Sequence, residues 1–501
     1  MSKFNTATEN SMKTVNHEGH AAYSMPPKLK LISQVLTSFF NESKFYGDNS
    51  EELVETLKAV IKTDPRFVSN LAIFARREFN MRSVSHVLVG YLANIPEGKP
   101  FVKHTVKNII LRGDDATEIL AFYLNTFGKP IPNSLRKALR EVFPTFDAYT
   151  LAKYKGDSKS VKMRDILCLC RPVPKNEEQS KLWKDLLEGN IKPAYTWETE
   201  LSAKGNKKEV WDELISSGKV GYMALLRNLR NILNAQPDHI YDVFKKISDP
   251  EAVRKSRQLP FRYLSAYKNI PWDSWWKADA LEAIEKAAEI SVENLPKIPG
   301  RTVIAIDVSG SMGSSISSKS DIRCSDISAL LGIIASKICE RSIVWTFDHE
   351  LREARYSKED GIISTAMKTS AAGGGTNMYL PFEAMLERNI VADRIITLSD
   401  NECNYTFKSD EDDWHNILPP YYSYRHSNDT VQSIVKKYRE RVNPNFWVHA
   451  IDLQGYGTQQ FIGERTNVIA GWSEKIFEFI TLAEQGIDTL EKRIENYKPE
   501  K

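Results

Sequence analysis

The chain has 501 residues. A single hydrophobic core rarely supports a domain of that size, so two to four domains are expected. With 42% hydrophobic and 27% charged residues, its composition is that of a soluble globular protein. No run of about 18 apolar residues occurs, so no membrane span is expected. The polar stretch of residues 1–25 lacks the apolar core of a secretion signal, and we expect it to be a flexible tail of a cytoplasmic protein.

Charge is unevenly distributed along the chain. Residues 1–300 hold 45 Lys and Arg against 36 Asp and Glu, a net charge of +9. Residues 301–501 hold 23 against 29, a net charge of −6. A basic half joined to an acidic half favours binding of a polyanion by the first half, although +9 over 300 residues is only mildly basic.

The cysteines indicate a reducing compartment. They are odd in number and scattered, at Cys168, Cys170, Cys324, Cys339 and Cys403. Their spacing fits neither a zinc site nor a redox pair, so we expect five reduced thiols.

Residues 26–295 are predicted to form an all-helical domain, because apolar residues recur there at helical spacing. Helices are expected at residues 51–62, 67–93, 102–111, 116–125, 134–142, 165–169, 181–187, 211–216, 222–233, 240–247 and 279–290. The connections are short and carry Pro or Gly. Many helices with short connections predict antiparallel helix pairs that stack into a solenoid, although no sequence period is evident.

Two of these helices place cations on one face. Arg227 and Arg230 lie on the side of their helix away from its leucines, and Arg76 and Arg77 follow Phe74 in the same way. From periodicity alone, a solvated polar face explains this pattern better than an RNA-binding surface does.

A third basic region is denser. Six cations fall within nineteen positions, at Lys153, Lys155, Lys159, Lys162, Arg164 and Arg171. Such a cluster can bind RNA phosphates, which gives affinity with little sequence specificity. The neighbouring Tyr149 and Tyr154 offer stacking surfaces for unpaired bases.

The pattern changes at the Pro-rich linker of residues 295–300, and residues 296–501 are predicted to form a second domain. Short apolar strands are expected at residues 302–306, 342–347, 394–398 and 445–452, with helices at 327–338, 379–387 and 430–441. Buried strands that alternate with helices predict a Rossmann-like parallel sheet covered on both faces. The overall fold class is therefore mostly α plus α/β.

The first of these strands leads into the strongest motif of the chain, D-x-S-x-S at Asp307, Ser309 and Ser311. A glycine-rich loop presents Thr376, and a later buried strand ends at Asp400. Ligands of open parallel sheets bind beyond the carboxyl ends of the strands, where these residues are expected to meet. Their hard oxygen atoms suit Mg²⁺, or Mn²⁺, better than zinc or copper.

This combination resembles a von Willebrand factor A domain with a metal-ion-dependent adhesion site. The resemblance implies a metal held by Asp307, Ser309, Ser311, Thr376 and Asp400, with one coordination position left open for the acidic group of a partner protein. Such a site binds and does not by itself catalyse. The chain also offers no convincing general base near Asp307, so an enzyme is not expected.

The helical half and the metal motif together resemble the Ro ribonucleoprotein family, whose helical part is the TROVE module. The resemblance rests on residues 224–230 (ALLRNLR), 164–169 (RDILCL) and 259–263 (LPFRY), besides the metal motif. It implies HEAT-like repeats that close into a ring, small Y-like RNA on an outer basic surface, and single-stranded ends of misfolded RNA in the central hole. It also implies a role in RNA quality control and, from bacterial relatives, an exoribonuclease partner. Arg171 stands where the family pattern has His.

Two functions stay open at this point. The chain is either an RNA-binding scaffold or a protein-adhesion scaffold that captures a partner carboxylate through the metal and binds no RNA. Only the RNA-binding scaffold predicts an affinity that falls steeply as the salt concentration rises. No feature indicates oligomerisation, so we expect a monomer.

Overall fold

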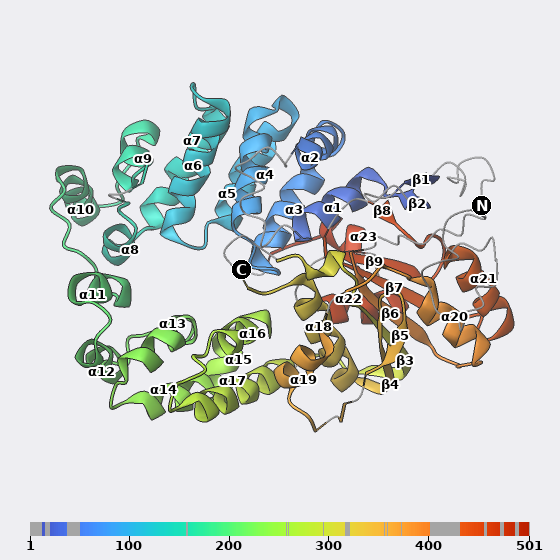
Figure 1. The fold of residues 1–501 in the computed structure, drawn as a ribbon. Helices are drawn as coiled ribbons and strands as arrows, with labels where there is room; N and C mark the ends of the chain where they lie inside the picture. The colour runs from blue at the N-terminus through green and yellow to red at the C-terminus, as the bar shows by residue number, and fades with distance from the viewer. Residues whose placement is uncertain are drawn as a thin grey trace. The chain divides into compact units, whose positions relative to one another are not determined.

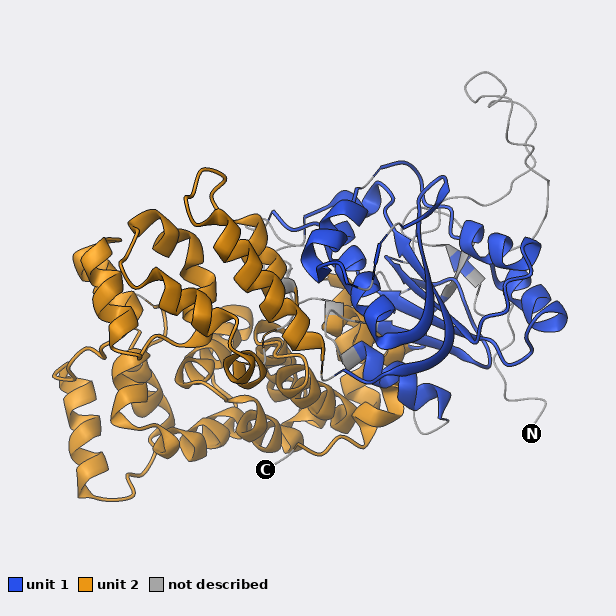
Figure 2. Ribbon diagram, turned by 90° about the horizontal axis from the view of Figure 1, so that it is seen from below, with its two compact units in different colours: residues 1–26, 295–487 blue, residues 27–294, 488–501 orange. Residues whose placement is uncertain are grey.

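The computed structural model describes residues 13–15, 21–37, 51–156, 159–256, 258, 260–293, 295–315, 321–354, 356–357, 359–371, 373–400, 431–454, 458–470, 475–485 and 490–499. The chain forms two compact units (Figure 2). The sheet unit comprises Met1–Pro26 and Leu295–Ile487, and the helical unit comprises Pro27–Asn294 and Asp488–Lys501. Among the described residues, no helix has the length and apolar character needed to span a membrane.

The helical unit contains α1 (Pro27–Thr37), α2 (Glu51–Thr63), α3 (Pro65–Arg77), α4 (Ser83–Asn94), η5 (Pro96–Phe101), α5 (Val102–Ile109), α6 (Gly113–Phe127), α7 (Asn133–Val142), η6 (Phe143–Thr145), α8 (Ala148–Lys153), α9 (Met163–Cys170), α10 (Glu177–Glu188), α11 (Trp197–Lys204), α12 (Lys208–Ser216), α13 (Tyr222–Ala235), α14 (Ile240–Ile247), α15 (Pro250–Ser256), α16 (Pro260–Lys268), α17 (Lys277–Val292) and α23 (Leu490–Glu495).

These helices stack in two rows over the first half of the unit (Figure 1). In one row α3 contacts α5, α5 contacts α7 and α7 contacts α9, while in the second row α2 contacts α4 and α4 contacts α6. Helices of this length cannot bury their apolar faces alone, and stacking each pair on the next covers those faces. The expected array of stacked helix pairs is confirmed.

One expected helix is in fact two. The apolar pattern over residues 67–93 is interrupted between α3 and α4, where Asn80 adopts a left-handed backbone conformation with φ of 55°. Asn tolerates this region better than most residues, so the chain can turn there without losing the helical periodicity on either side.

A buried carboxylate joins the three helices α3, α4 and α6. Asp115, in the first turn of α6, is fully buried and lies 3.2 Å from Nη2 of Arg76 on α3 and 3.2 Å from Nε2 of His86 on α4. It also accepts a hydrogen bond from Arg82 and from two backbone N–H groups that precede the helix. Burial alone would raise the pKa of Asp115, but His86 and the two arginines hold it far below its usual range.

The end of the described chain completes the helical unit. Tyr497 packs edge-on against Phe74 of α3, with 5.2 Å between ring centroids, and its hydroxyl donates to Glu78 at 2.7 Å. The side chain of Asn70 donates to the backbone carbonyl of Glu495 at 2.8 Å. Residues 488–501 were expected in the second domain, and the structure instead groups them with the helices because α23 buries its apolar face on α3.

The sheet unit contains β1 (Lys13–Val15), β2 (Ala21–Ser24), β3 (Ile298–Asp307), η7 (Ser311–Gly313), α18 (Cys324–Ile338), β4 (Cys339–Phe347), β5 (Leu351–Glu353), α19 (Ile362–Thr369), α20 (Tyr379–Glu387), β6 (Arg394–Ser399), α21 (Val431–Arg441), β7 (Trp447–Asp452), β8 (Thr458–Gln459), β9 (Thr466–Ala470) and α22 (Lys475–Glu484).

Its main sheet has the strand order β5-β4-β3-β6-β7-β9, and all pairings are parallel except that of β5 with β4. Helices lie on both sides of these strands, with α18 and α22 on one side and α20 and α21 on the other (Figure 1). At Gly332 of α18, an added Cβ would lie 2.4 Å from Ile306 of β3, so the helix can approach the central strand only through a glycine. The expected parallel sheet covered on both faces is confirmed.

The first described residues belong to the sheet unit. β2 pairs with β1 and with β8, which places Tyr23 opposite Gln459 and Ser24 opposite Thr458. Residues 1–25 were expected to be a flexible tail, and the described strands of this stretch are instead held by backbone pairing. Strands of three and four residues carry too little apolar alternation for the sequence to reveal them.

We predict that Asp115→Asn destabilises the helical unit. The change leaves Arg76 buried without a carboxylate, which typically costs about 3–5 kcal/mol. Thermal unfolding followed by circular dichroism should show a midpoint several degrees lower. The difference from the unmodified protein should shrink as the pH falls below about 4, because the depressed pKa of Asp115 gives its full stabilisation above the pKa of an unfolded aspartate and progressively less below it.

A matched control is Asp238→Asn, which removes the carboxylate of an exposed ion pair with Lys208. Exposed pairs contribute about 0–1 kcal/mol, so its midpoint should barely move. Equal shifts in the two variants would contradict the structural role assigned to Asp115.

Candidate metal centre and nucleic-acid interface

The central strand β3 delivers Asp307 to the carboxyl edge of the sheet. The side chain is fully buried, and its two oxygens are held by different elements. Oδ1 accepts the backbone N–H of Ser309 at 2.9 Å, and Oδ2 accepts the hydroxyl of Ser399, the last residue of β6, at 2.5 Å. Because β3 and β6 pair in parallel, their ends meet, and this orients the carboxylate.

The two serines of the motif face each other. The hydroxyls of Ser309 and Ser311 lie 3.2 Å apart. Ser309 is fully buried, and Ser311 is half-buried at the start of η7. Two hydroxyls this close can bind a common ligand, as the sequence predicted for a metal.

The glycine-rich loop is joined to the motif loop through the backbone. The N–H of Gly310 donates to the carbonyl of Gly374 at 2.8 Å, and that of Gly373 donates to the carbonyl of Val308 at 2.9 Å. Gly374 has φ of 76°, and a Cβ there would lie 2.2 Å from Nδ1 of His349, so both conformation and space require glycine. These contacts bring the buried Thr376 to the same edge of the sheet as Ser309.

Asp400 directly follows β6 and is also buried. All five predicted ligands therefore lie at the carboxyl ends of β3 and β6, on the loops that follow them or on the glycine-rich loop bonded to the motif loop. The prediction missed Ser399, which orients Asp307. Its position at the end of a buried strand next to a predicted ligand is the signal that could have identified it.

Within the part of the chain that the structure describes, no cation pairs with Asp307. Burial, together with the nearby carboxylate of Asp348, raises the pKa of Asp307 to about 6, although the hydrogen bonds from Ser309 and Ser399 lower it. Asp348 is itself paired with Arg352 at 3.0 Å. A divalent cation would stabilise the ionised form of Asp307.

The donor set decides which cation fits. The described residues include no cluster of three or more His, Cys, Asp or Glu side chains suited to a metal, so a zinc-type site is absent from this part of the chain. Carboxylate and hydroxyl oxygens are the ligands of Mg²⁺ and Mn²⁺. The residues present therefore fit such an ion. The four described cysteines are free, as expected, and Cys403 lies outside the described residues.

The basic cluster of residues 153–171 lies on α8, on α9 and on the segments that flank α9. Lys153 is exposed and lies over the rings of Tyr149 and Tyr154, 5.7 and 5.6 Å from their centroids. Arg164 and Arg171 are exposed, and neither forms an ion pair within the described residues. These side chains can reach phosphates without first breaking a contact.

Other members of the cluster also have local roles. The exposed Lys159 lies 3.5 Å from Glu118, and Lys155 and Lys162 are half-buried. The backbone N–H of Lys162 donates to Asp165 at the start of α9. Arg171 ends α9 in a left-handed conformation with φ of 51°. The cluster therefore presents fewer free cations than its composition suggests.

Two of the remaining predicted RNA-binding residues have structural roles. Arg76 is buried, donates to the carbonyl of Ile109 and pairs with Asp115, so it cannot reach a ligand, and its assignment to an RNA surface is corrected. Arg77 is half-buried and donates to the carbonyl of Asn108 at 3.0 Å. By contrast, Arg227 and Arg230 are exposed on α13, separate from the cluster on α8 and α9 (Figure 1).

Family comparisons cover most of the chain. Residues 30–192 and 189–272 match the TROVE domain, and residues 301–412 match the Ro60 vWA domain. Among solved structures, the RO (RSR) protein of Deinococcus radiodurans shares the fold with a TM-score of 0.58 and 15% identity, over 86% of this chain and 93% of that one.

Among curated proteins, the chain is similar to telomerase protein component 1 of Rattus norvegicus, with 24% identity over 327 residues, 48% of this chain and 12% of that protein. It is also similar to the RNA-binding protein RO60 of Caenorhabditis elegans, with 27% identity over 250 residues, 47% of this chain and 35% of that protein. The matched part thus spans well under two thirds of either relative. Because both of its parts are matched in chain order, the chain belongs to the Ro ribonucleoprotein family, which joins a TROVE module to a von Willebrand factor A domain.

Proposed function

We propose that this protein is a non-enzymatic ribonucleoprotein scaffold that binds small structured RNA and the ends of misfolded RNA. The observation that carries the proposal is the exposed, partly unpaired basic cluster on α8 and α9, within residues that match the TROVE domain. A relative bears the name RNA-binding protein, in agreement with this. The proposal includes Y-like RNA, a ring-shaped arrangement, the cytoplasm as its location and RNA quality control as its role.

We further propose that the sheet unit binds a protein through Mg²⁺ or Mn²⁺ held by the loops at the ends of β3 and β6. Asp307, Ser309, Ser311, Thr376 and Asp400 would hold the ion, which would supply an open coordination position for a partner carboxylate. Ser399 and the backbone of Ser309 keep Asp307 oriented for this. The protein partner that we propose is an exoribonuclease. RNA on the helices and a protein on the metal are compatible functions.

The first prediction concerns the basic cluster. A variant with Lys153→Gln, Lys159→Gln, Arg164→Gln and Arg171→Asn should bind a small hairpin RNA at least tenfold more weakly at about 150 mM salt, since phosphate contacts dominate such affinities. Its affinity should also depend less on salt, because fewer counterions are released on binding. Fluorescence anisotropy titrations at several salt concentrations measure both effects.

The matched control removes the same charge from exposed lysines elsewhere in the helical unit, at Lys245, Lys255, Lys277 and Lys286. This variant should bind the hairpin nearly as well as the unmodified protein. Equal losses in the two variants would show that only overall charge matters. If the unmodified protein binds no RNA above background, the alternative function is correct. The protein is then an adhesion scaffold that binds a partner protein through the metal and binds no RNA.

The second prediction concerns the metal. Asp307→Ala should abolish binding of Mn²⁺, measured by electron paramagnetic resonance of the free ion, and should leave affinity for the hairpin RNA within about twofold. Asp360→Asn, an exposed carboxylate of the same unit, is the control and should bind Mn²⁺ normally. Loss of both activities in a folded Asp307→Ala variant would refute the separation of RNA and metal functions.

A further inference from the structure

Three loops at the carboxyl edge of the main sheet are joined by backbone hydrogen bonds. The N–H of Val308, directly after β3, donates to the carbonyl of Phe347 at the end of β4 at 2.9 Å. The N–H of Asn377 donates to the carbonyl of Asp348 at 2.8 Å. The turn between β4 and β5, residues 348–350, is therefore bonded both to the D-x-S-x-S loop and to the glycine-rich loop.

This turn carries His349, a side chain to which the proposed functions assign no role. The side chain is 50% exposed, and its ring lies against the backbone of Gly374, where an added Cβ would lie 2.2 Å from Nδ1. The carbonyl of Gly374 accepts the N–H of Gly310 at 2.8 Å. Because Gly310 stands between the predicted metal ligands Ser309 and Ser311, the imidazole borders the surface on which the metal would be held.

The buried carboxylate of Asp348 orients this ring. Its Oδ1 lies 3.2 Å from Nδ1 of His349 and accepts the backbone N–H of Glu350 at 2.8 Å. Its Oδ2 accepts a hydrogen bond from Nη1 of Arg352 at 3.0 Å. An ionised carboxylate can only accept hydrogen bonds, so the proton of a neutral ring belongs on Nδ1 and leaves Nε2 as an acceptor. Oε1 of Glu350 lies 3.9 Å from Nε2, beyond hydrogen-bond distance, and offers no donor.

Small residues next to the ring allow a peptide backbone to come close. Gly373 and Gly374 are exposed and have no side chain, and the exposed Ser314 directly follows η7. In a peptide, the carboxylate of an acidic residue is accompanied by backbone N–H donors, whereas a free carboxylate ion such as acetate has none. An imidazole acceptor beside the metal surface can therefore distinguish an acidic peptide from a carboxylate ion.

We propose that His349 is a specificity-determining residue of the sheet unit, whose Nε2 accepts a backbone N–H of an acidic peptide segment while the carboxylate of that segment binds the metal. This rests on the proposed metal-dependent binding of a protein and defines the chemistry of the partner. The partner presents an Asp or Glu on an exposed segment with a free backbone N–H group beside it. Asp348 is a positioning residue, because it acts through the ring of His349.

The test uses the full chain loaded with Mn²⁺ at about pH 8, where an ordinary imidazole is neutral. Water proton relaxation reports the displacement of water from the bound ion by two probes, sodium acetate and the blocked tripeptide acetyl-Gly-Asp-Gly-amide. His349→Ala should weaken binding of the tripeptide by about three- to tenfold, the loss expected for one hydrogen bond. Its affinity for acetate should stay within about twofold of that of the unmodified protein, because acetate has no N–H to donate.

Two further variants separate a hydrogen bond from simple packing of the ring. His349→Gln keeps an acceptor and should recover most of the affinity for the tripeptide, whereas His349→Phe keeps a ring without an acceptor and should lose as much as His349→Ala. The matched control is His239→Ala, which removes a similarly exposed histidine from the helical unit and should change neither affinity. Electron paramagnetic resonance of free Mn²⁺ should show that every variant binds the ion within about twofold of the unmodified protein.

Several results would overturn the inference. They are a His349→Ala variant with unchanged affinity for the tripeptide, a variant that loses acetate and tripeptide equally, and a His349→Phe variant that binds the tripeptide normally. A tripeptide that binds the unmodified protein no more tightly than acetate does would also overturn it. In each of these cases the binding of Mn²⁺ and of a carboxylate leaves the proposed metal function standing. An unmodified protein that binds no Mn²⁺ refutes the proposed metal function and the inference together.

Discussion

Compensation of buried charge shapes both units of this protein. A fully buried carboxylate lies in each, and the cost of removing such a group from water has to be offset locally. In the helical unit two arginines and a histidine surround Asp115, which stays ionised and joins α3, α4 and α6. In the sheet unit Asp307 receives, from the described residues, hydrogen bonds from Ser309 and Ser399 and no ion pair. The charge of Asp115 is therefore compensated by side chains of the protein, whereas the site of Asp307 is suited to accept a cation.

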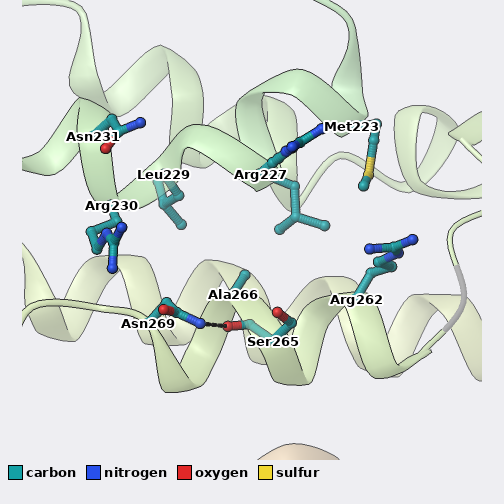
Figure 3. Close-up of a pocket in the computed structure, with 10 residues that line it drawn as sticks. Met223, Arg227, Leu229, Arg230, Asn231, Arg262, Ser265, Ala266 and Asn269 are labelled. Atoms are coloured by element: carbon teal, nitrogen blue, oxygen red, sulfur yellow. Dashed lines mark hydrogen bonds between the residues drawn. The ribbon is translucent and has the colours of Figure 1, made fainter. Parts of the chain in front are cut away.

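The same principle separates structural arginines from those that can bind a ligand. Arg76 and Arg230 each lie on a helix with a strong apolar face, but the next helix pair covers Arg76 and supplies its carboxylate. On α13, Arg227 and Arg230 face a cavity whose other wall is α16, and both side chains stay exposed there (Figure 3). What an arginine does in a stacked helical array thus depends on its position relative to the neighbouring pair.

Much of this organisation could be predicted from the sequence, because it follows from local patterns. The D-x-S-x-S motif after an apolar strand and the glycine-rich loop located the cluster at the sheet edge. The apolar periodicity located helices such as α2 and α13. The roles of Arg76 and Ser399 could not be predicted, since they depend on partners about 40 and 90 residues away. Short strands such as β2 and β8 are too short to show a periodicity, and they pair with each other across more than 400 residues of sequence.

The contact of α23 with α3 has a consequence for biosynthesis. Domains usually fold as they leave the ribosome, in order along the chain. Here Glu78, which directly follows α3, accepts a hydrogen bond from Tyr497, 419 positions later and just beyond α23, so the array of helices cannot gain this contact until the intervening sheet unit has been made. Until then the apolar residues that α23 covers are left without their partner and are exposed to chaperones or aggregation. A fragment that ends near residue 294 would keep that defect permanently, and tests of the helices alone should include residues 488–501.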